Sequence, residues 1–208
     1  MKLIGMLDSP FVRRVAISLR LLGLPFGHAP VSVFRGFDEF RQINPVVKAP
    51  TLVCDDGTVL MDSTLILQYA EALAGRSLQA ASPAALCHEL RLTGLALAAC
   101  EKTAQIVYER GLRPAEKLHE PWIERVSGQL RAAYAALDAE LARQPLALEE
   151  AVLGQAAITS AVAWTFTRFM LPEVVQDEEF PALAAHAAAA EALPVFLAVP
   201  CDDSVTLS

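Results

Sequence analysis

The chain has little of what several classes of protein require. Only 17 of its 208 residues are Lys or Arg, against 24 Asp or Glu, so the net charge is −7 at pH 7. Because nucleic acids and anionic membrane surfaces bind clustered positive charge, and the basic residues here are scattered, we expect neither as a partner. Charged residues make up 20% and hydrophobic residues 54% of the chain, a balance that excludes disorder.

Cysteine is scarce as well. Cys54, Cys87, Cys100 and Cys201 form no Cys-x-x-Cys pair and no zinc-ligand spacing. They are typical of reduced thiols in the cytosol, where disulfides are rare. The four histidines also lack metal-ligand spacing and the pattern of a hydrolytic triad. The sequence therefore predicts a protein without a metal site, in the cytoplasm.

Long apolar segments are absent. The N-terminus carries only Lys2 before Asp8 and lacks the apolar region and the cleavage site of a secretory signal peptide. The longest uncharged run, residues 151–167, includes five polar side chains and is too short to span a bilayer. We expect a buried helix there.

The first third of the chain is predicted to alternate short strands and helices. The expected elements are strand 2–6, helix 10–22, strand 28–33, helix 37–43, strands 51–54 and 58–61, and helix 63–74. Asp55-Asp56-Gly57 separates the last two strands and is a strong hairpin signal. The order βαβ-α-ββα indicates a small α/β domain over residues 1–75.

Beyond Gly75 the pattern becomes helical. Residues 76–83 are small and polar and are predicted to form a linker, followed by an all-helical domain over 84–208. Two of its helices show apolar faces, the first with Leu86, Leu90, Leu97, Cys100, Ala104 and Val107 and the second with Ile123, Val126, Leu130, Ala133, Leu137 and Leu141. Residues 153–170 are apolar almost all round, which predicts an enclosed helix.

Ser9-Pro10 joins the first predicted strand to the first helix. The start of a helix offers free backbone N–H groups and the positive end of the helix dipole, which favour an anion. Ser9 could cap this helix, or its hydroxyl could donate a hydrogen bond to a bound thiolate.

Two later segments also carry polar chemistry next to a strand or helix. Pro50 directly precedes a strand, where proline belongs at a start or a tight turn, and a cis bond there would leave the backbone of Ala49 free to pair with an extended peptide. Asp62-Ser63 opens a helix and suits an ammonium and a carboxylate. The alternatives are an ordinary helix cap at Asp62 or Ser63 and a solvated side chain at Lys48.

Together these segments resemble the glutathione S-transferase superfamily, in particular its serine-type bacterial members. The matching pieces are Ser9-Pro10-Phe11-Val12-Arg13, Asn44-Pro45 with Lys48-Ala49-Pro50-Thr51-Leu52, Asp62-Ser63 before Ile66 and Tyr69, and, near the end, 180–186 and 194–196. Residues 1–75 resemble the thioredoxin-like N-terminal domain of that family, and residues 84–200 its helical C-terminal domain.

The resemblance implies an enzyme, a glutathione transferase with glutathione as co-substrate and no metal. Ser9 would be catalytic and stabilise the glutathione thiolate, which attacks a small electrophile or a peroxide. Ala49 would hold the cysteinyl backbone with Pro50 in the cis form. The implied roles of the remaining residues are the γ-glutamyl end for Asp62 and Ser63 and the glycyl carboxylate for Lys48.

The resemblance also implies a second-substrate pocket and a homodimer. The pocket would be lined by Leu7, Phe11, Phe34, Gln105 and Tyr108. The dimer would use residues 66–73 and 86–107. Residues 152–155 depart from the family, because they lack the hydroxyl and the acid of the capping box that often starts its buried helix.

Two other functions are alternatives to a transferase with a role in detoxification. A thiol–disulfide reductase needs a cysteine at the strand–helix junction, and this chain has Ser9 there. A non-catalytic relative that serves as a protein-interaction or regulatory module stays open. Binding of glutathione separates that alternative from the enzyme.

Overall fold

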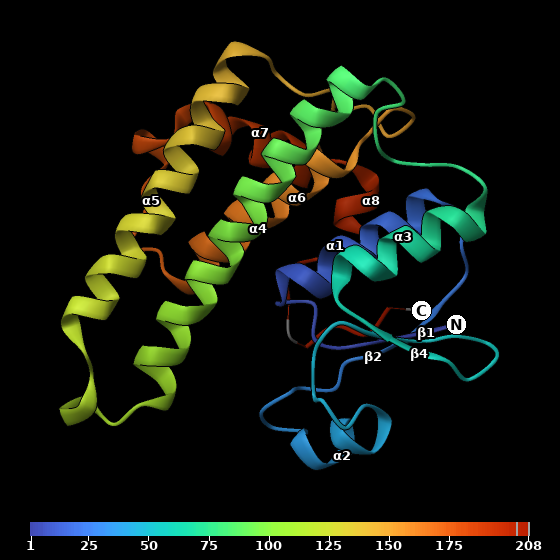
Figure 1. Ribbon diagram of the computed structural model, residues 1–208, viewed down its shortest axis with the longest axis horizontal. Helices are drawn as coiled ribbons and strands as arrows, with labels where there is room; N and C mark the ends of the chain where they lie inside the picture. Colours follow the sequence, from blue (N-terminus) through green and yellow to red (C-terminus); the bar gives the residue numbers. More distant parts are fainter. Residues whose placement is uncertain (203, 208) are drawn as a thin grey trace. The chain divides into compact units, whose positions relative to one another are not determined.

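The computed structural model describes residues 1–202 and 204–207, and contacts group them into two units (Figure 1). Unit 1 contains residues 1–78, 150–152 and the described residues from 192 onward; unit 2 contains 79–149 and 153–191. Residues from 192 onward therefore group with the N-terminal segment, whereas the division drawn from the sequence assigns them to the helical domain. The extent of independently folding domains stays a prediction.

Unit 1 is built on a small mixed sheet. Its elements are β1 (Lys2–Ile4), α1 (Pro10–Leu21), β2 (Gly27–Ala29), α2 (Phe37–Ile43), β3 (Thr51–Val53), β4 (Val59–Met61), α3 (Ser63–Ala74) and, near the C-terminus, α8 (Pro194–Leu197). The strand order is β2-β1-β3-β4, with β1 parallel to β2 and the other pairs antiparallel. The predicted order βαβ-α-ββα is confirmed.

Helices cover both faces of this sheet. Figure 1 shows α1 and α3 side by side on one face and α2 on the other. Ile4 packs against Val31 and Phe40, the latter from α2, so Leu3 points to the opposite face, because successive strand residues alternate. Leu3 and its cross-strand partner Leu52 are fully buried there.

All four strands are shorter than the sequence predicts, β3 and β4 by one residue each and β1 and β2 by more. Strand β2 ends at Ala29 because the next residue, Pro30, has no N–H to continue the ladder. Strand β1 ends at Ile4 because Gly5 turns to a φ of +136°, far from an extended strand. The predicted hairpin is confirmed, with Gly57 at a φ of +86° and the Cys54 N–H bonded to the Thr58 carbonyl at 2.9 Å.

The C-terminal segment packs onto α1 and β2 within unit 1. Arg13 of α1 donates from Nε to the Val199 carbonyl at 2.8 Å, and its guanidinium lies 5.6 Å from the centre of the Phe196 ring. The N–H of Leu207 donates to Nδ1 of His28 at 3.1 Å. These contacts account for the grouping of the C-terminal residues with the sheet.

Unit 2 is helical, as predicted. It contains α4 (Pro83–Leu112), α5 (Glu120–Arg143), α6 (Gln155–Met170) and α7 (Pro181–Glu191), with short 3-10 turns η1 (Ala115–Lys117) and η2 (Asp177–Glu179). Among the described residues, no helix combines the length and the apolar composition that a bilayer-spanning segment needs. The predicted buried face of α5 is confirmed at all six positions.

The apolar face that the sequence indicates for α4 is not the face that the helix buries. Its core residues are Leu92, Ala96, Ala99, Cys100, Thr103, Ile106 and Glu109, and of the predicted set only Cys100 is buried. Leu90 is 54% exposed. Small residues decide the packing, because they let α6 approach closely enough for the Thr103 and Thr167 hydroxyls to bond at 2.6 Å.

Helix α6 is enclosed, with Gly154 at its N-cap. No side chain caps its first turn, so the predicted absence of a capping box is confirmed. The helix begins two residues later than the sequence suggests, so that Ala157, rather than Gln155, stands at the position of the acid in a capping box. The hydroxyl of Tyr134 donates to the Ala163 carbonyl at 2.9 Å, and the Tyr134 ring packs edge-on against Trp164.

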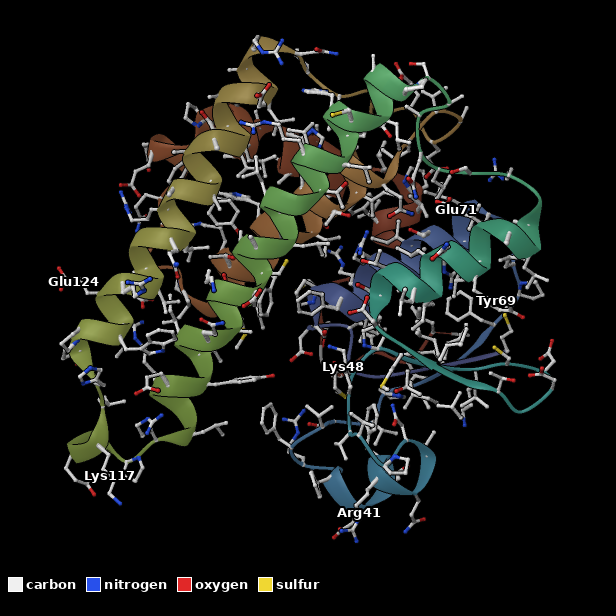
Figure 2. All side chains as sticks on the ribbon, in the orientation of Figure 1. Arg41, Lys48, Tyr69, Glu71, Lys117 and Glu124 are labelled. Atoms are coloured by element: carbon white, nitrogen blue, oxygen red, sulfur yellow. The ribbon has the colours of Figure 1, made fainter. Side chains whose placement is uncertain are left out.

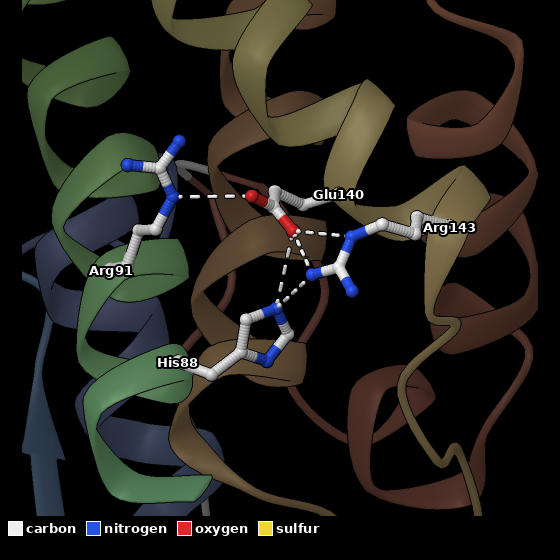
Figure 3. Close-up of polar contacts among 4 residues, drawn as sticks. All are labelled: His88, Arg91, Glu140 and Arg143. Atoms are coloured by element: carbon white, nitrogen blue, oxygen red, sulfur yellow. Dashed lines mark hydrogen bonds and ion pairs between the residues drawn. The ribbon is translucent and has the colours of Figure 1, made fainter. Parts of the chain in front are cut away.

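An ion-pair cluster links α4 to α5 (Figure 3). Glu140 of α5 lies 3.2 Å from Nε of Arg91 and 3.4 Å from Nε2 of His88, both on α4, and also bonds Arg143. The hydrogen bond from Arg143, followed by those from His88 and Arg91, lowers the pKa of Glu140 to about 2. Glu140 is therefore ionised throughout the neutral range.

Unit 2 should lose stability as the pH falls below about 7, because His186 is buried. Burial lowers the pKa of His186 below its ordinary value of 6.5, while its Nε2–H donates to the Ala157 carbonyl at 3.0 Å. The unfolded chain then binds a proton that the folded chain does not, so the free energy of unfolding falls by up to about 1.4 kcal/mol per pH unit as the pH drops from 6.5. Denaturant titrations between pH 7 and 5 should show a shallower dependence for His186→Gln; an equal dependence would contradict this assignment.

Candidate functional site

Ser9 lies at the N-cap of α1, at the point where the β1–α1 loop ends. Its backbone is extended, with φ −72° and ψ 122°, and its side chain is half-buried. The hydroxyl makes no capping bond and no other hydrogen bond to a described residue. Because Pro10 has no N–H, the free donors of the first turn are those of Phe11 and Val12. The fold leaves the Ser9 hydroxyl available beside a helix N-terminus.

Gly5 brings the loop that carries Ser9 close to the segment before β3. A Cβ atom at Gly5 would lie 2.6 Å from Cγ2 of Val12 and 3.2 Å from Cβ of Ala49, so only glycine fits. His28 fixes the loop from the other side, because its Nε2–H donates to the Gly5 carbonyl at 2.8 Å. Burial lowers the pKa of His28, which keeps the ring neutral and leaves Nδ1 able to accept.

The segment before β3 presents a free backbone at Ala49. The Ala49–Pro50 bond is cis. Neither the N–H nor the C=O of Ala49 is hydrogen-bonded to a described residue. Two buried side chains brace the turn, since Asn44 donates from Nδ2 to the Thr51 hydroxyl at 2.8 Å and that hydroxyl donates to the Lys48 carbonyl at 2.7 Å. Buried side chains therefore stabilise this turn, and the backbone of Ala49 is not needed to hold it in place.

Asp62 and Ser63 begin α3. Asp62 is the N-cap and accepts from the Thr64 N–H at 2.9 Å through Oδ1, while Oδ2 lies 3.9 Å from Nζ of Lys48. Figure 2 labels Lys48 among the side chains of unit 1. Ser63 is 3% exposed, and its Oγ accepts from Nη1 of Arg14 at 3.1 Å. Asp62 is therefore a helix cap through one carboxylate oxygen, while its other oxygen faces Lys48.

Unusual backbone conformations mark the same segments. Among the described residues other than glycine, Val47 with φ 52° and Asp62 with φ 73° have positive φ. Such conformations cost free energy and concentrate at ligand clamps, most clearly for a β-branched residue such as valine. Asp62 is itself a site residue predicted from the sequence, and Val47 is adjacent to another, Lys48.

The structure links the predicted segments and adds residues that the sequence analysis missed. Gly5 approaches Ala49, and Lys48 faces Asp62, so the three segments meet in pairs within unit 1. The residues not predicted for the site are Arg14, Asn44 and Thr51, whose buried side chains hydrogen-bond to Ser63 and to the turn at Lys48. Arg14 had one signal, a charge on the otherwise apolar side of the helix 10–22.

The residues predicted for a second-substrate pocket have different surroundings. In unit 1, Leu7 is fully buried, Phe11 is half-buried and Phe34 is 50% exposed. In unit 2, Gln105 is half-buried on α4 and Tyr108 is 45% exposed. Their union in one pocket stays a prediction. Within the described part of the chain, no group of His, Cys, Asp or Glu could hold a metal ion.

Comparisons with known proteins match this architecture. Residues 3–78 match the family model described as glutathione S-transferase, N-terminal domain. An uncharacterized GST-like protein, YibF of Escherichia coli K12, is 28% identical over 179 residues, which cover 83% of this chain and 85% of that protein.

Solved structures extend the match over nearly the whole chain. A glutathione transferase family member from Pseudomonas fluorescens Pf-5, with bound glutathione, has a TM-score of 0.80 and 29% identity over 95% of this chain and 97% of that one. A glutathione S-transferase from Methylobacterium radiotolerans JCM 2831, in complex with glutathione sulfonate, has a TM-score of 0.84 over 99% and 97% and, at 24% identity, supports the fold alone. Residues 3–78 therefore belong to the family of glutathione S-transferase N-terminal domains, and the thioredoxin-like mixed sheet followed by a helical part is similar over nearly the whole chain to solved glutathione transferase structures.

Proposed function

We propose that this protein is a glutathione transferase that binds glutathione in unit 1 and activates its thiol as a thiolate. The observation that carries the proposal is the Ser9 hydroxyl, which no described residue uses and which lies at the N-terminus of α1. A free cysteine thiol has a pKa of about 8.5, so little of it is ionised at neutral pH. A hydroxyl donor and a helix N-terminus aimed at the sulfur favour the anion and lower that pKa.

The remaining groups suit the rest of the tripeptide. The free N–H and C=O of Ala49 can pair with the cysteinyl backbone, as an added strand pairs with a sheet edge. Asp62 and Ser63 suit the ammonium and the carboxylate of the γ-glutamyl end, and Lys48 suits the glycyl carboxylate. Binding of glutathione in the Pseudomonas fluorescens relative supports this assignment.

The chemistry needs no covalent bond to the enzyme. The thiolate forms a sulfur–carbon bond with an electrophilic carbon, and the leaving group departs with its electron pair. With a peroxide the thiolate forms a sulfur–oxygen bond while the O–O bond breaks; the alkoxide leaves with the electron pair and takes up a proton from water, so the sulfur is oxidised to a sulfenic acid and the peroxide is reduced to an alcohol. Ser9 stabilises the sulfur anion before the attack and remains unchanged. We further propose a detoxifying role in the cytoplasm, where reduced cysteines, none of them in a disulfide among the described residues, would be stable.

Calorimetry with glutathione, followed by a panel of electrophiles and peroxides, tests the proposal. We expect saturable binding and glutathione-dependent turnover of at least one compound. Binding without turnover across the panel would favour the non-catalytic interaction module, and absence of binding would overturn the proposal.

Asp62→Ala should raise the KM for glutathione with little change in kcat, because Asp62 meets the ligand far from its sulfur and contributes equally in ground and transition states. The loss of the Thr64 cap should also cost about 1 kcal/mol of stability. Steady-state kinetics and thermal melting separate the two effects. A lower melting temperature with unaltered glutathione affinity would show that Asp62 is only a helix cap.

The protein should form a homodimer through residues 66–73 and 86–107. Leu65, Tyr69 and Leu73 lie on one side of α3, four residues apart, and are 58%, 38% and 52% exposed (Figure 2 labels Tyr69). Such a stripe is typical of an interface. Light scattering coupled to size exclusion should give about twice the 22.4 kDa of one chain, and Leu65→Glu/Leu73→Glu should reduce it to one. A wild-type mass of one chain at micromolar concentration would contradict the prediction.

A further inference from the structure

A buried arginine stands behind the first turn of α3. Arg14 on α1 is 3% exposed, and a buried guanidinium is tolerated only when its N–H groups find acceptors. Its Nη1 donates to Ser63 Oγ at 3.1 Å and lies 3.4 Å from Thr64 Oγ1. The positive charge of α1 therefore contacts the hydroxyl at the first position of α3.

This contact sets the hydrogen-bonding role of the Ser63 hydroxyl. A serine hydroxyl has one hydrogen to donate and two lone pairs, and a guanidinium can only donate. Ser63 Oγ must therefore accept from Arg14, which leaves its hydrogen for another partner. Ser63 is only 3% exposed, and its hydroxyl donates to no described residue. Ser63 therefore keeps a donor that no described residue uses, next to the Arg14 cation.

We propose that Arg14 is a positioning residue that turns the Ser63 hydroxyl into a donor for a ligand carboxylate. The inference rests on the proposed binding of glutathione and assigns to this pair the recognition of its γ-glutamyl α-carboxylate. Asp62, one residue before Ser63, supplies the negative charge for the neighbouring ammonium. A hydrogen bond to a charged acceptor is stronger than a neutral one, so the pair should select ligands that carry the carboxylate.

Calorimetry with two ligands tests this role. The first is glutathione, and the second is 4-aminobutyryl-Cys-Gly, which keeps the amine and lacks only the α-carboxylate. We expect wild-type protein to prefer glutathione, and Arg14→Gln to reduce that preference about tenfold while leaving the affinity for the analogue unchanged. A merely structural role of Arg14 would weaken both ligands alike.

Arg13→Gln is the matched control. Arg13 is the neighbouring buried arginine of α1, but its bond goes to the Val199 carbonyl. This variant should melt at a lower temperature and keep the wild-type preference. An unchanged preference in folded Arg14→Gln, or the same loss in Arg13→Gln, would overturn the proposal. Wild-type protein that binds neither ligand would instead overturn the proposed function on which it rests.

A second pair of variants covers the case in which Arg14→Gln does not fold. Arg14→Lys keeps a positive charge but has a shorter reach to the Ser63 hydroxyl, and Ser63→Ala removes that hydroxyl. Both variants should therefore lose the preference for glutathione over the analogue to the same extent. If Arg14 acts through Ser63, adding Arg14→Lys to Ser63→Ala should change the preference no further. Independent, additive losses would show that Arg14 does not act through this hydroxyl.

Discussion

Ser9→Ala should lower turnover with a generic electrophile about 10- to 100-fold, because it removes one hydrogen bond to a thiolate, worth about 1.5–3 kcal/mol. The pKa of the bound glutathione thiol should rise at the same time, since the anion loses a donor. Glutathione should still bind, because the other proposed contacts lie along the peptide. The rate–pH profile and the ultraviolet absorbance of the bound thiolate measure both changes.

Stability separates this role from that of a helix cap. The Ser9 hydroxyl makes no capping bond, so Ser9→Ala should leave the melting temperature almost unchanged. Loss of a working cap would cost about 1 kcal/mol. Ser9→Thr keeps a hydroxyl and should retain part of the turnover. A wild-type rate–pH profile in Ser9→Ala would remove Ser9 from the mechanism.

Gly5→Ala should destabilise the protein by about 2–4 kcal/mol, because a positive φ outside the helical regions disfavours a side chain and the new methyl overpacks. Gly5 has a φ of +136°, and its Cβ would lie 2.6 Å from Val12, a fully buried side chain. Urea unfolding gives the change directly. Because the missing side chain at Gly5 also lets the Ser9 loop lie close to Ala49, the affinity for glutathione should fall as well.

Gly57→Ala is the matched control for this effect. Gly57 also has a positive φ, +86°, but nothing lies within 4 Å of the position of its Cβ. It should lose at most about 1 kcal/mol, since the backbone strain is partly offset by the reduced freedom of the unfolded chain. Equal losses in the two variants would show that the contact with Val12 carries no weight.

The sequence alone determined the local elements. Periodicity predicted the bounds of 37–43 and 63–74 as they are observed, and Asp55-Asp56-Gly57 predicted the hairpin. These features depend on neighbours a few residues apart, which turn chemistry and helical period describe. The motifs that match the family are of the same kind, because each occupies one short stretch.

Packing between distant segments was not predictable in this way. The buried face of α4 differs from its most apolar side, because close approach to α6 at Thr103 outweighs the burial of Leu90. The placement of residues 192 onward with the sheet depends on Arg13, which bonds the carbonyl of Val199 across 186 positions of the chain. No local pattern encodes such a partner.

In the candidate site, too, the sequence determined some features and the packing of distant segments determined others. The sequence determined which groups could meet glutathione, from Ser9 to Ser63, since their residue types suit a thiolate, a peptide backbone and a zwitterion. Only the tertiary structure decided which hydroxyl stays free and which is engaged, because the Ser9 hydroxyl caps nothing whereas Ser63 accepts from Arg14, 49 positions away. A hydroxyl can both donate and accept, so its role follows from the partner that the fold places beside it.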